Sequence, residues 1–344
     1  MNRSLTSSLQ ISRRAALALS VALLGACAQM APTPDPLPSW NEGPAKEAIV
    51  QFVRKTTDSA SPQFVPPAQR VATFDQDGTL WVEQPMYAQV AFALDRVKEV
   101  VKAQPALANE EPFKAVVTGD RAAMARFTEA DLLKIVGASQ AGLTIEAFRD
   151  VVKAWATTAK HPRFQRPYTE LVYAPMVEAM KYLRANGYRT YIVTGGGQEF
   201  VRAFADAVYG VPPEQVIGSM LKVDYSVRNG VPTLTNAPAV FFVNDKAGKP
   251  VGINMVIGQR PQAAFGNSDG DQQMLEWTTA GAGARLGMLV LHDDAQREFA
   301  YGPAAGLPES RVGTFPQSLY DEAKAKGWTV ISIKKDWKRV FGFD

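Results

Sequence analysis

One short stretch organises this chain: Val71-Ala72-Thr73-Phe74-Asp75-Gln76-Asp77-Gly78-Thr79-Leu80-Trp81. The apolar run at its start predicts a buried strand, and two carboxylates one residue apart follow it. Alternate residues of a strand share a face, so Asp75 and Asp77 should point the same way. Ligands of open α/β sheets bind beyond the carboxyl ends of the strands. Two like charges there favour a divalent cation, although an Asp-rich turn after a strand is the simpler alternative.

The motif Phe-Asp-X-Asp-Gly-Thr-Leu resembles the first signature of the haloacid dehalogenase superfamily. The resemblance implies that Asp75 is a nucleophile forming an aspartyl-phosphate and that Asp77 is the general acid and base. The second aspartate favours the phosphatase branch over the dehalogenase branch. We therefore expect a Mg²⁺-dependent hydrolase that acts on a small phosphate monoester. Such chemistry depends mostly on positioning and on neutralising charge.

A second apolar segment, residues 188–193, predicts a strand that ends in Thr194-Gly195-Gly196-Gly197. This resembles the second signature of the same superfamily. The resemblance implies that the Thr194 hydroxyl bonds the phosphoryl group. The backbone N–H groups of the glycines, Gly195 first, would bind phosphate at the start of a helix predicted over residues 199–209.

The third signature of the superfamily is a lysine, and three lysines are candidates: Lys222, Lys246 and Lys249. We prefer Lys249, because Gly248-Lys249-Pro250 is a typical helix start and Pro suits the first turn. Lys246 is the alternative. The chosen lysine would neutralise the aspartate and phosphate charges.

The segment Gly266-Asn267-Ser268-Asp269-Gly270-Asp271 follows a strand predicted over residues 262–265 and resembles the fourth signature. The resemblance implies a Mg²⁺ site made by Asp75, Asp77, Asn267 and Asp271. Asn267 stands where the pattern has an aspartate, and an amide oxygen binds a hard cation but adds no charge. We expect weaker Mg²⁺ binding unless Asp269 turns inward. The alternative is an Asx/Gly turn that caps a helix over residues 272–278.

The N-terminus has the pattern of an export signal. Arg3, Arg13 and Arg14 precede an apolar run, residues 15–26, which is too short to span a bilayer. Ser12-Arg13-Arg14 resembles a twin-arginine signal, and the general secretory route stays open.

The apolar run ends in Leu24-Gly25-Ala26-Cys27, which resembles a bacterial lipobox, and Cys27 is the only cysteine. We expect a lipid anchor on Cys27, followed by a Pro-rich tether, and a protein of the periplasm or cell envelope at the outer membrane. The alternative is a small residue inside an ordinary signal peptide.

The pattern of elements predicts an α/β fold, with a three-layer Rossmann-like core, a parallel sheet and an inserted helical cap. The alternative for the insert is a helical subdomain without substrate contacts. Within the insert, Thr128 indicates a helix start and Gly137 a helix end. Val216-Ile217-Gly218-Ser219 predicts a short strand. Asn229-Gly230 predicts a hairpin, as in the phosphoserine phosphatase-like branch. The expected boundaries are 1–26 for the signal peptide, 27–44 for the tether, 45–84 for the first part of the core, 85–168 for the cap, and 169–344 for the rest of the core with a β excursion at 220–243.

Charge and composition narrow the function. Without the three N-terminal arginines the chain has 34 basic and 34 acidic residues, so no nucleic-acid binding is expected. The chain has two histidines, which excludes a His-rich zinc site, and His292 is interpreted as a strand-end turn residue. Phosphoserine, phosphocholine-type head groups, sugar phosphates and nucleotides all fit as substrates. A phosphotransferase and a non-catalytic envelope lipoprotein are the alternative functions, and the sequence leaves the oligomeric state open.

Overall fold

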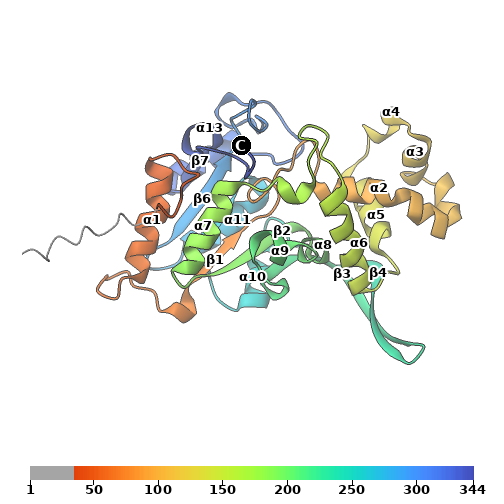
Figure 1. The fold of residues 1–344 in the computed structure, drawn as a ribbon, viewed down its shortest axis with the longest axis horizontal. Coiled ribbons are helices and arrows are strands. Elements are labelled where there is room, and N and C mark those ends of the chain that lie inside the picture. The colour runs from red at the N-terminus through yellow and green to blue at the C-terminus, as the bar shows by residue number, and fades with distance from the viewer. Residues whose placement is uncertain (1–34) are drawn as a thin grey trace, which may run out of the picture. The chain divides into compact units, whose positions relative to one another are not determined.

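Seven strands form a single, mostly parallel sheet in the computed structural model, which describes residues 35–344 (Figure 1). Their order is β4-β3-β2-β1-β5-β6-β7, and only the β3–β4 pair is antiparallel. The strands are β1 (Val71–Phe74), β2 (Arg189–Gly197), β3 (Val216–Arg228), β4 (Val231–Phe242), β5 (Ala263–Gly266), β6 (Leu286–Leu291) and β7 (Thr329–Ser332). The predicted α/β class is therefore confirmed.

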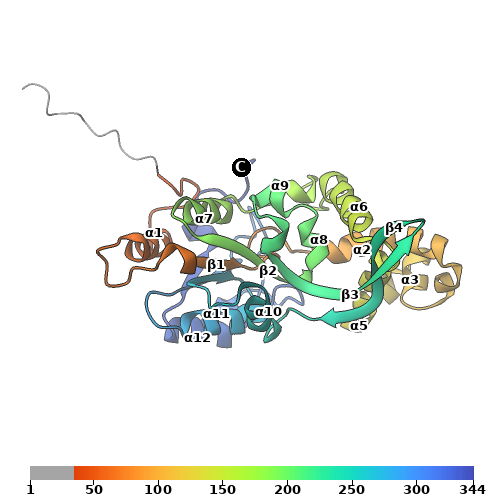
Figure 2. The same cartoon turned by 90° about the horizontal axis from the view of Figure 1, so that it is seen from below.

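Helices cover both faces of this sheet, which gives three layers (Figure 2). On one face, Ile49 and Met176 pack with Phe74 of β1; on the other, Ile253 and Leu275 pack with Val71. The alternation along β1 follows from the two-residue period of a strand. The helices are α1 (Pro44–Thr57), α7 (Ala174–Ala185), α8 (Gln198–Arg202), α9 (Ala205–Tyr209), α10 (Gly248–Ile257), α11 (Gln272–Thr279), α12 (Gln317–Ala325) and α13 (Ile333–Asp336).

Strand β1 lies at the point where the strand order reverses. It pairs with β2 on one side and β5 on the other, and all four of its residues are buried. Phe74 and Phe265 stack across β1 and β5 with ring centroids 4.3 Å apart. In doubly wound sheets ligands bind at such a switch point, beyond the carboxyl ends of the strands. The first and fourth signatures, Asp75 and Asn267, therefore lie where a ligand would bind.

Between β1 and β2, the segment where the cap was expected contains five α-helices, and α7 follows them. Val97, Phe113 and Ile135 form an apolar cluster of their own there. Gly137 was expected to end one of these helices, but that helix continues to Gln140, because a mid-helix glycine is tolerated. The five are α2 (Ala88–Ala103), α3 (Phe113–Thr118), α4 (Arg121–Met124), α5 (Glu129–Gln140) and α6 (Ile145–Thr158).

The β excursion is one long hairpin that extends β3 and β4 beyond the sheet (Figure 2). The predicted short strand from Val216 continues without a break to Arg228, and Asn229-Gly230 makes the turn with positive φ at both residues. That geometry suits two-residue hairpin turns. The expected single helix over 199–209 is instead α8 and α9, interrupted at Phe204, which has a non-helical φ of −133°.

The N-terminal expectations fall mostly outside the described residues. These include the signal peptide, Cys27 and most of the tether. Leu37 and Trp40 are buried, and Trp40 packs edge-on against Trp337 with centroids 6.3 Å apart. Leu37 and Trp40, which fall within the expected tether, are therefore part of the packed core. Across residues 35–344, no helix has the length and apolar character needed to cross a membrane.

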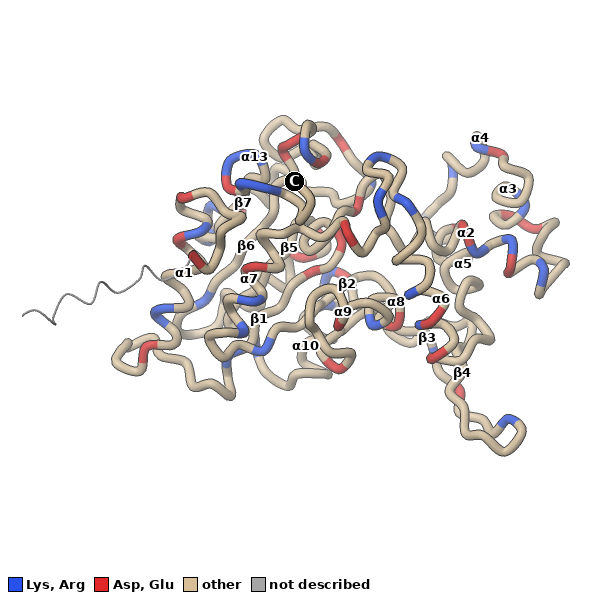
Figure 3. Tube along the Cα trace, in the orientation of Figure 1, with Lys and Arg blue, Asp and Glu red and all other residues tan. Residues whose placement is uncertain are grey.

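Lys and Arg are interspersed with Asp and Glu along the trace of residues 35–344 (Figure 3). Each sign of charge is spread over core and inserted helices alike. The buried charges are the informative ones, because ionised side chains are almost never fully buried unless they are paired. Lys249, Asp271 and Glu298 are such residues, and all three lie near the carboxyl ends of the strands.

Candidate active site

The centre of the site is Lys249 between two aspartates. Its Nζ donates to Asp75 Oδ1 at 2.5 Å and to Asp271 Oδ1 at 2.6 Å. Asp75 follows β1, Lys249 lies in the first turn of α10, and Asp271 precedes α11. The lysine is 2% exposed, so this is a desolvated arrangement in which charge interactions are strong. Of the three candidate lysines, the structure brings Lys249 to the site. Lys246 pairs with Asp269 at the surface, 3.1 Å away, and Lys222 lies exposed on β3.

Burial and charge oppose each other in this triad. Burial lowers the pKa of Lys249, but the carboxylates of Asp271 and Asp75 outweigh it, and the net shift is upward. Burial and the Asp271 charge raise the pKa of Asp75, and Lys249 limits that rise. The lysine therefore stays charged, and its contact opposes the rise that burial and Asp271 impose on the pKa of Asp75.

Asp77 is held by the indole of Trp81. Trp81 Nε1 donates to Asp77 Oδ1 at 2.7 Å, and the indole stacks on Phe204 with centroids 4.8 Å apart. Burial raises the pKa of Asp77 to about 6, although the Trp81 hydrogen bond opposes the shift. A carboxyl group that titrates near pH 6 can hold a proton and release it close to neutrality. The other carboxylate oxygen of Asp77, Oδ2, accepts no hydrogen bond from a protein group among residues 35–344.

Thr194 and the three glycines that follow it lie beside Asp77, and they form the end of β2, which was expected to stop at Val193. The Thr194 hydroxyl accepts the Gly196 N–H at 2.9 Å. A Cβ at Gly196 would lie 3.2 Å from Thr194 Oγ1 and 3.8 Å from Asp77 Oδ2. Gly195 approaches Asp245 in the same way, at 3.2 Å from its Oδ1. The glycines therefore let the backbone approach the carboxylates closely, as the sequence predicts for a phosphate-binding turn.

Asn267 and Asp271 lie in the loop after β5. The Asn267 amide accepts from Thr79 Oγ1 at 3.1 Å and donates to Glu83 Oε1 at 2.7 Å. Asp271 Oδ2 accepts the backbone N–H groups of Asn267 and Ser268 at 2.9 and 3.1 Å. Asp271 thus has both oxygens engaged within the protein, where it holds Lys249 and the loop. Its expected role as a metal ligand stays a prediction.

The remaining oxygens fit a hard cation. Among residues 35–344, no group of three or more His, Cys, Asp or Glu side chains is arranged to hold a metal. Mg²⁺ commonly takes only one or two protein carboxylates and keeps several waters. Asp75, Asp77 and the amide oxygen of Asn267 supply such a set, and these three residues would hold it. Asp269 does not turn inward, because it pairs with Lys246.

The sequence reasoning missed a second buried cluster of polar side chains. It lies behind the loop that follows β1, residues 75–79, which we call the signature loop. His292 Nε2 donates to the Gly78 carbonyl at 2.8 Å, and Nδ1 lies 3.0 Å from Glu298 Oε2. Both partners are acceptors, so both ring nitrogens carry protons. Burial lowers the pKa of His292, but the Glu298 carboxylate outweighs it and raises the pKa. His292 therefore supports the signature loop, beyond the turn role expected for it.

Glu83 belongs to the same buried cluster. It accepts from Tyr301 at 2.7 Å as well as from Asn267, and burial raises its pKa to about 8. Gln89, at the start of α2, accepts the Gly197 N–H at 2.7 Å and ties the inserted helices to the glycine turn. An acidic residue eight positions after Asp75, inside an apolar stretch, was the available signal for Glu83. Nothing local marked Gln89 or Tyr301.

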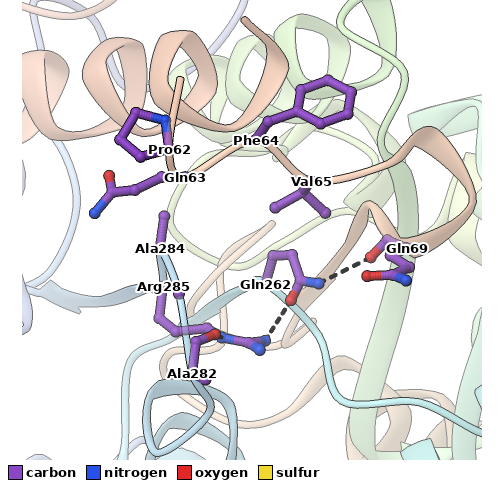
Figure 4. Close-up of a pocket in the computed structure, with 10 residues that line it drawn as sticks. Pro62, Gln63, Phe64, Val65, Gln69, Gln262, Ala282, Ala284 and Arg285 are labelled. Carbon is purple, nitrogen blue, oxygen red and sulfur yellow. Dashed lines mark hydrogen bonds between the residues drawn. The ribbon is translucent and has the colours of Figure 1, made fainter. Parts of the chain in front are cut away.

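A cavity of about 180 Å³ lies elsewhere, at the amino ends of the strands (Figure 4). Its lining includes Val65, Gln69, Gln262 and Arg285, which precede β1, β5 and β6. Gln262 donates to the Gln69 carbonyl at 3.1 Å across it. Since Asp75 and Asn267 follow the carboxyl ends of β1 and β5, this cavity is separate from the site.

Several solved structures match this chain, all with low sequence identity. A conserved, functionally unknown protein from Anaerococcus prevotii DSM 20548 matches with 16% identity and a TM-score of 0.49, covering 73% of this chain and 86% of that chain. A protein of unknown function from Bordetella pertussis Tohama I matches with 16% identity and a TM-score of 0.45, covering 76% and 98%. A phosphoserine phosphohydrolase-like protein from Francisella tularensis matches with 18% identity and a TM-score of 0.35, covering 65% and 88%.

A search of curated proteins finds no match. The model of one protein family, haloacid dehalogenase-like hydrolase, matches residues 72–276. That range contains all four signature segments and more than half of the chain. It also contains every residue of the Asp75–Lys249–Asp271 triad. The chain belongs to the haloacid dehalogenase-like hydrolases.

Proposed function

We propose that the protein is a Mg²⁺-dependent phosphatase that hydrolyses a small phosphate monoester through an aspartyl-phosphate. One observation carries the proposal: at the switch point of the sheet, the buried Lys249 holds the carboxylate of Asp75 beside a second carboxyl group, Asp77, whose pKa is about 6. An anchored nucleophile and a nearby proton donor are the two groups that ester cleavage at phosphorus requires.

In the first step, an Asp75 oxygen attacks phosphorus and the bond from phosphorus to the ester oxygen breaks. Asp77 gives its proton to the departing alkoxide, which leaves as an alcohol. Lys249 and the backbone beside Gly195 stabilise charge on the phosphoryl oxygens. Mg²⁺, when bound, contributes further neutralisation of those oxygens.

In the second step, the ionised Asp77 takes a proton from water while the water oxygen attacks phosphorus. The bond between phosphorus and Asp75 breaks, phosphate leaves, and both carboxyl groups return to their starting states. The Trp81 hydrogen bond keeps Asp77 oriented through both steps. Gly196, beside both Thr194 and Asp77, leaves room for the phosphoryl group.

The test is phosphate release from a panel of small phosphomonoesters, with the purified chain in Mg²⁺ or in EDTA. We expect phosphate release in Mg²⁺ and none in EDTA. In Asp75→Asn, which keeps the shape of the side chain but not the nucleophile, we expect the rate of release to fall by at least ~10³-fold. Added alcohols that capture phosphate would indicate the phosphotransferase instead. If the chain is folded without Mg²⁺ and still releases phosphate from none of the esters, the proposal is contradicted and a binding role is favoured.

Anchoring to the cell envelope is a separate proposal that depends on sequence alone. Cys27 would carry lipid, and the site would then act on esters outside the cytoplasm. Metabolic labelling with a radioactive fatty acid should mark the wild-type chain and not Cys27→Ser. Labelling that is equal in both would contradict it.

A further inference from the structure

Asn267 and Glu83 form a buried pair at the position where the fourth signature departs from its usual aspartate. Asn267 Nδ2 donates to Glu83 Oε1 at 2.7 Å, and the two side chains are 1% and 2% exposed. The Oε1 atom acts as an acceptor toward Tyr301 as well, so the nitrogen end of the amide has to face it. The oxygen end is thereby turned to the signature loop, where it lies 3.1 Å from Thr79 Oγ1.

The surroundings leave the Glu83 carboxyl group one place to lie. Tyr301 donates to the same Oε1 atom at 2.7 Å. A Cβ on Gly78 would overlap both Glu83 and Asn267, and a Cβ on Gly313 would overlap Glu83. Both glycines also have positive φ, 74° and 63°. Two loops distant in sequence therefore close tightly around this pair and fix the rotamer of Glu83.

We propose that Glu83 is a positioning residue that fixes the Asn267 amide with its oxygen toward the metal site and compensates for the aspartate that the fourth signature lacks. This inference depends on the Mg²⁺ role proposed for Asn267. An amide presented by its nitrogen would repel a cation, whereas the oxygen coordinates it. Partners behind a metal ligand orient it, and their loss typically weakens metal binding by about 10–100-fold.

The first experiment measures Mg²⁺ binding to the full chain by isothermal titration calorimetry. Glu83→Met keeps the side-chain length but removes the acceptor, and we expect its Kd for Mg²⁺ to rise by about 10–100-fold. Glu83→Gln keeps an acceptor oxygen, so its Kd should stay within about threefold of wild type. Tyr301→Phe is the matched control: it removes the other hydrogen bond to the same oxygen and should also stay within about threefold.

The second experiment needs no metal. In EDTA, Asn267→Asp sets a second carboxyl group against Glu83, and we expect a lower melting temperature. In the double variant with Glu83→Gln, the amide at position 83 can donate to the carboxylate at position 267. The double variant should therefore melt at a higher temperature than the Asn267→Asp single variant. Such coupling is the sign of direct contact.

The outcomes separate the two proposals. If the wild-type chain binds Mg²⁺ and Glu83→Met binds it equally well, the positioning role is wrong while the proposed phosphatase stands. Equal weakening by Tyr301→Phe would also overturn the role, because loss of general packing would then explain the result. If the wild-type chain hydrolyses esters without binding Mg²⁺, the metal dependence fails and this inference with it. Additive melting temperatures would show that the pair is uncoupled and overturn the proposal.

Discussion

Two buried charged clusters flank the signature loop, and they differ in how they are built. The Asp75–Lys249–Asp271 triad consists of residues that follow or precede regular elements, each within a recognisable motif. The cluster of Glu83, His292 and Glu298 is assembled from the segment after the loop and from the chain beyond β6. Both clusters pair buried charges. Removing one partner leaves the other charge buried and uncompensated. The first cluster offers groups to a substrate, whereas the second holds the loop and Asn267 in place.

The largest expected effect comes from breaking the triad with Lys249→Met. Two buried carboxylates then face each other without a cation, and we expect a loss of about 3–5 kcal/mol in the free energy of unfolding, together with loss of phosphate release. Urea denaturation and the phosphomonoester assay measure the two effects. Lys246→Met is the matched control: it breaks a surface pair, which is expected to cost less than about 1 kcal/mol. Similar losses in the two variants would show that the triad is not special.

Breaking the second cluster with Glu298→Gln should destabilise the protein by a smaller amount, about 3 kcal/mol, because it leaves the His292 charge unpaired. The raised pKa of His292 adds stability that is present below its ordinary pKa and is lost as pH rises through the folded value. The difference between wild type and Glu298→Gln should therefore be larger at pH 5 than at pH 9. Urea denaturation at both pH values measures it, and a difference independent of pH would contradict the ion pair.

At high pH, Glu83→Gln should stabilise the protein relative to wild type, whereas the two variants above destabilise it. The carboxyl group titrates at about 8 in the folded chain, so it opposes folding increasingly as pH rises from its ordinary value to 8. In EDTA, we expect the variant to gain stability relative to wild type steadily as pH rises from 5 to about 8. Thermal melts across this range measure it. If the melting temperature of the variant falls relative to wild type as pH rises, Glu83 is stabilised as an anion in the folded chain.

Trp81→Phe gives the smallest and most specific change. Removing the indole hydrogen bond leaves burial to dominate at Asp77, and its pKa should rise above 6 by about one unit. Because the first step requires a protonated Asp77, the decline of kcat at high pH should begin at a correspondingly higher pH. Trp155→Phe is the control, since it removes an indole–carboxylate hydrogen bond to Asp95 away from the site. An equal shift in both variants would contradict the role of Trp81.

Much of the fold and of the triad could be predicted, because the signals are local. The apolar run before Asp75 and the Gly248-Lys249-Pro250 helix start lie where they were expected, whereas Thr194 lies within β2, which continues to Gly197. Errors arose where a local signal was outweighed. Gly137 suggested a helix end, but the Thr128–Asp131 capping box and the packing of α5 carry the helix past it. The contacts of Asp271 with Lys249 and two backbone N–H groups had no local signal, and its expected metal role stays a prediction.

The sequence by itself determined the order of elements, the switch point after Phe74 and the residue types of the reacting groups, since each depends on neighbours within a few positions. Tertiary structure alone decided that Lys249 is the lysine between Asp75 and Asp271. It also decided that Glu83 meets Asn267 across 184 residues and that His292 supports Gly78 across 214. Such contacts depend on how the loops at the ends of β1, β5 and β6 close over one another. That closure is set by side chains packing in three dimensions, and no periodic pattern in the sequence records it.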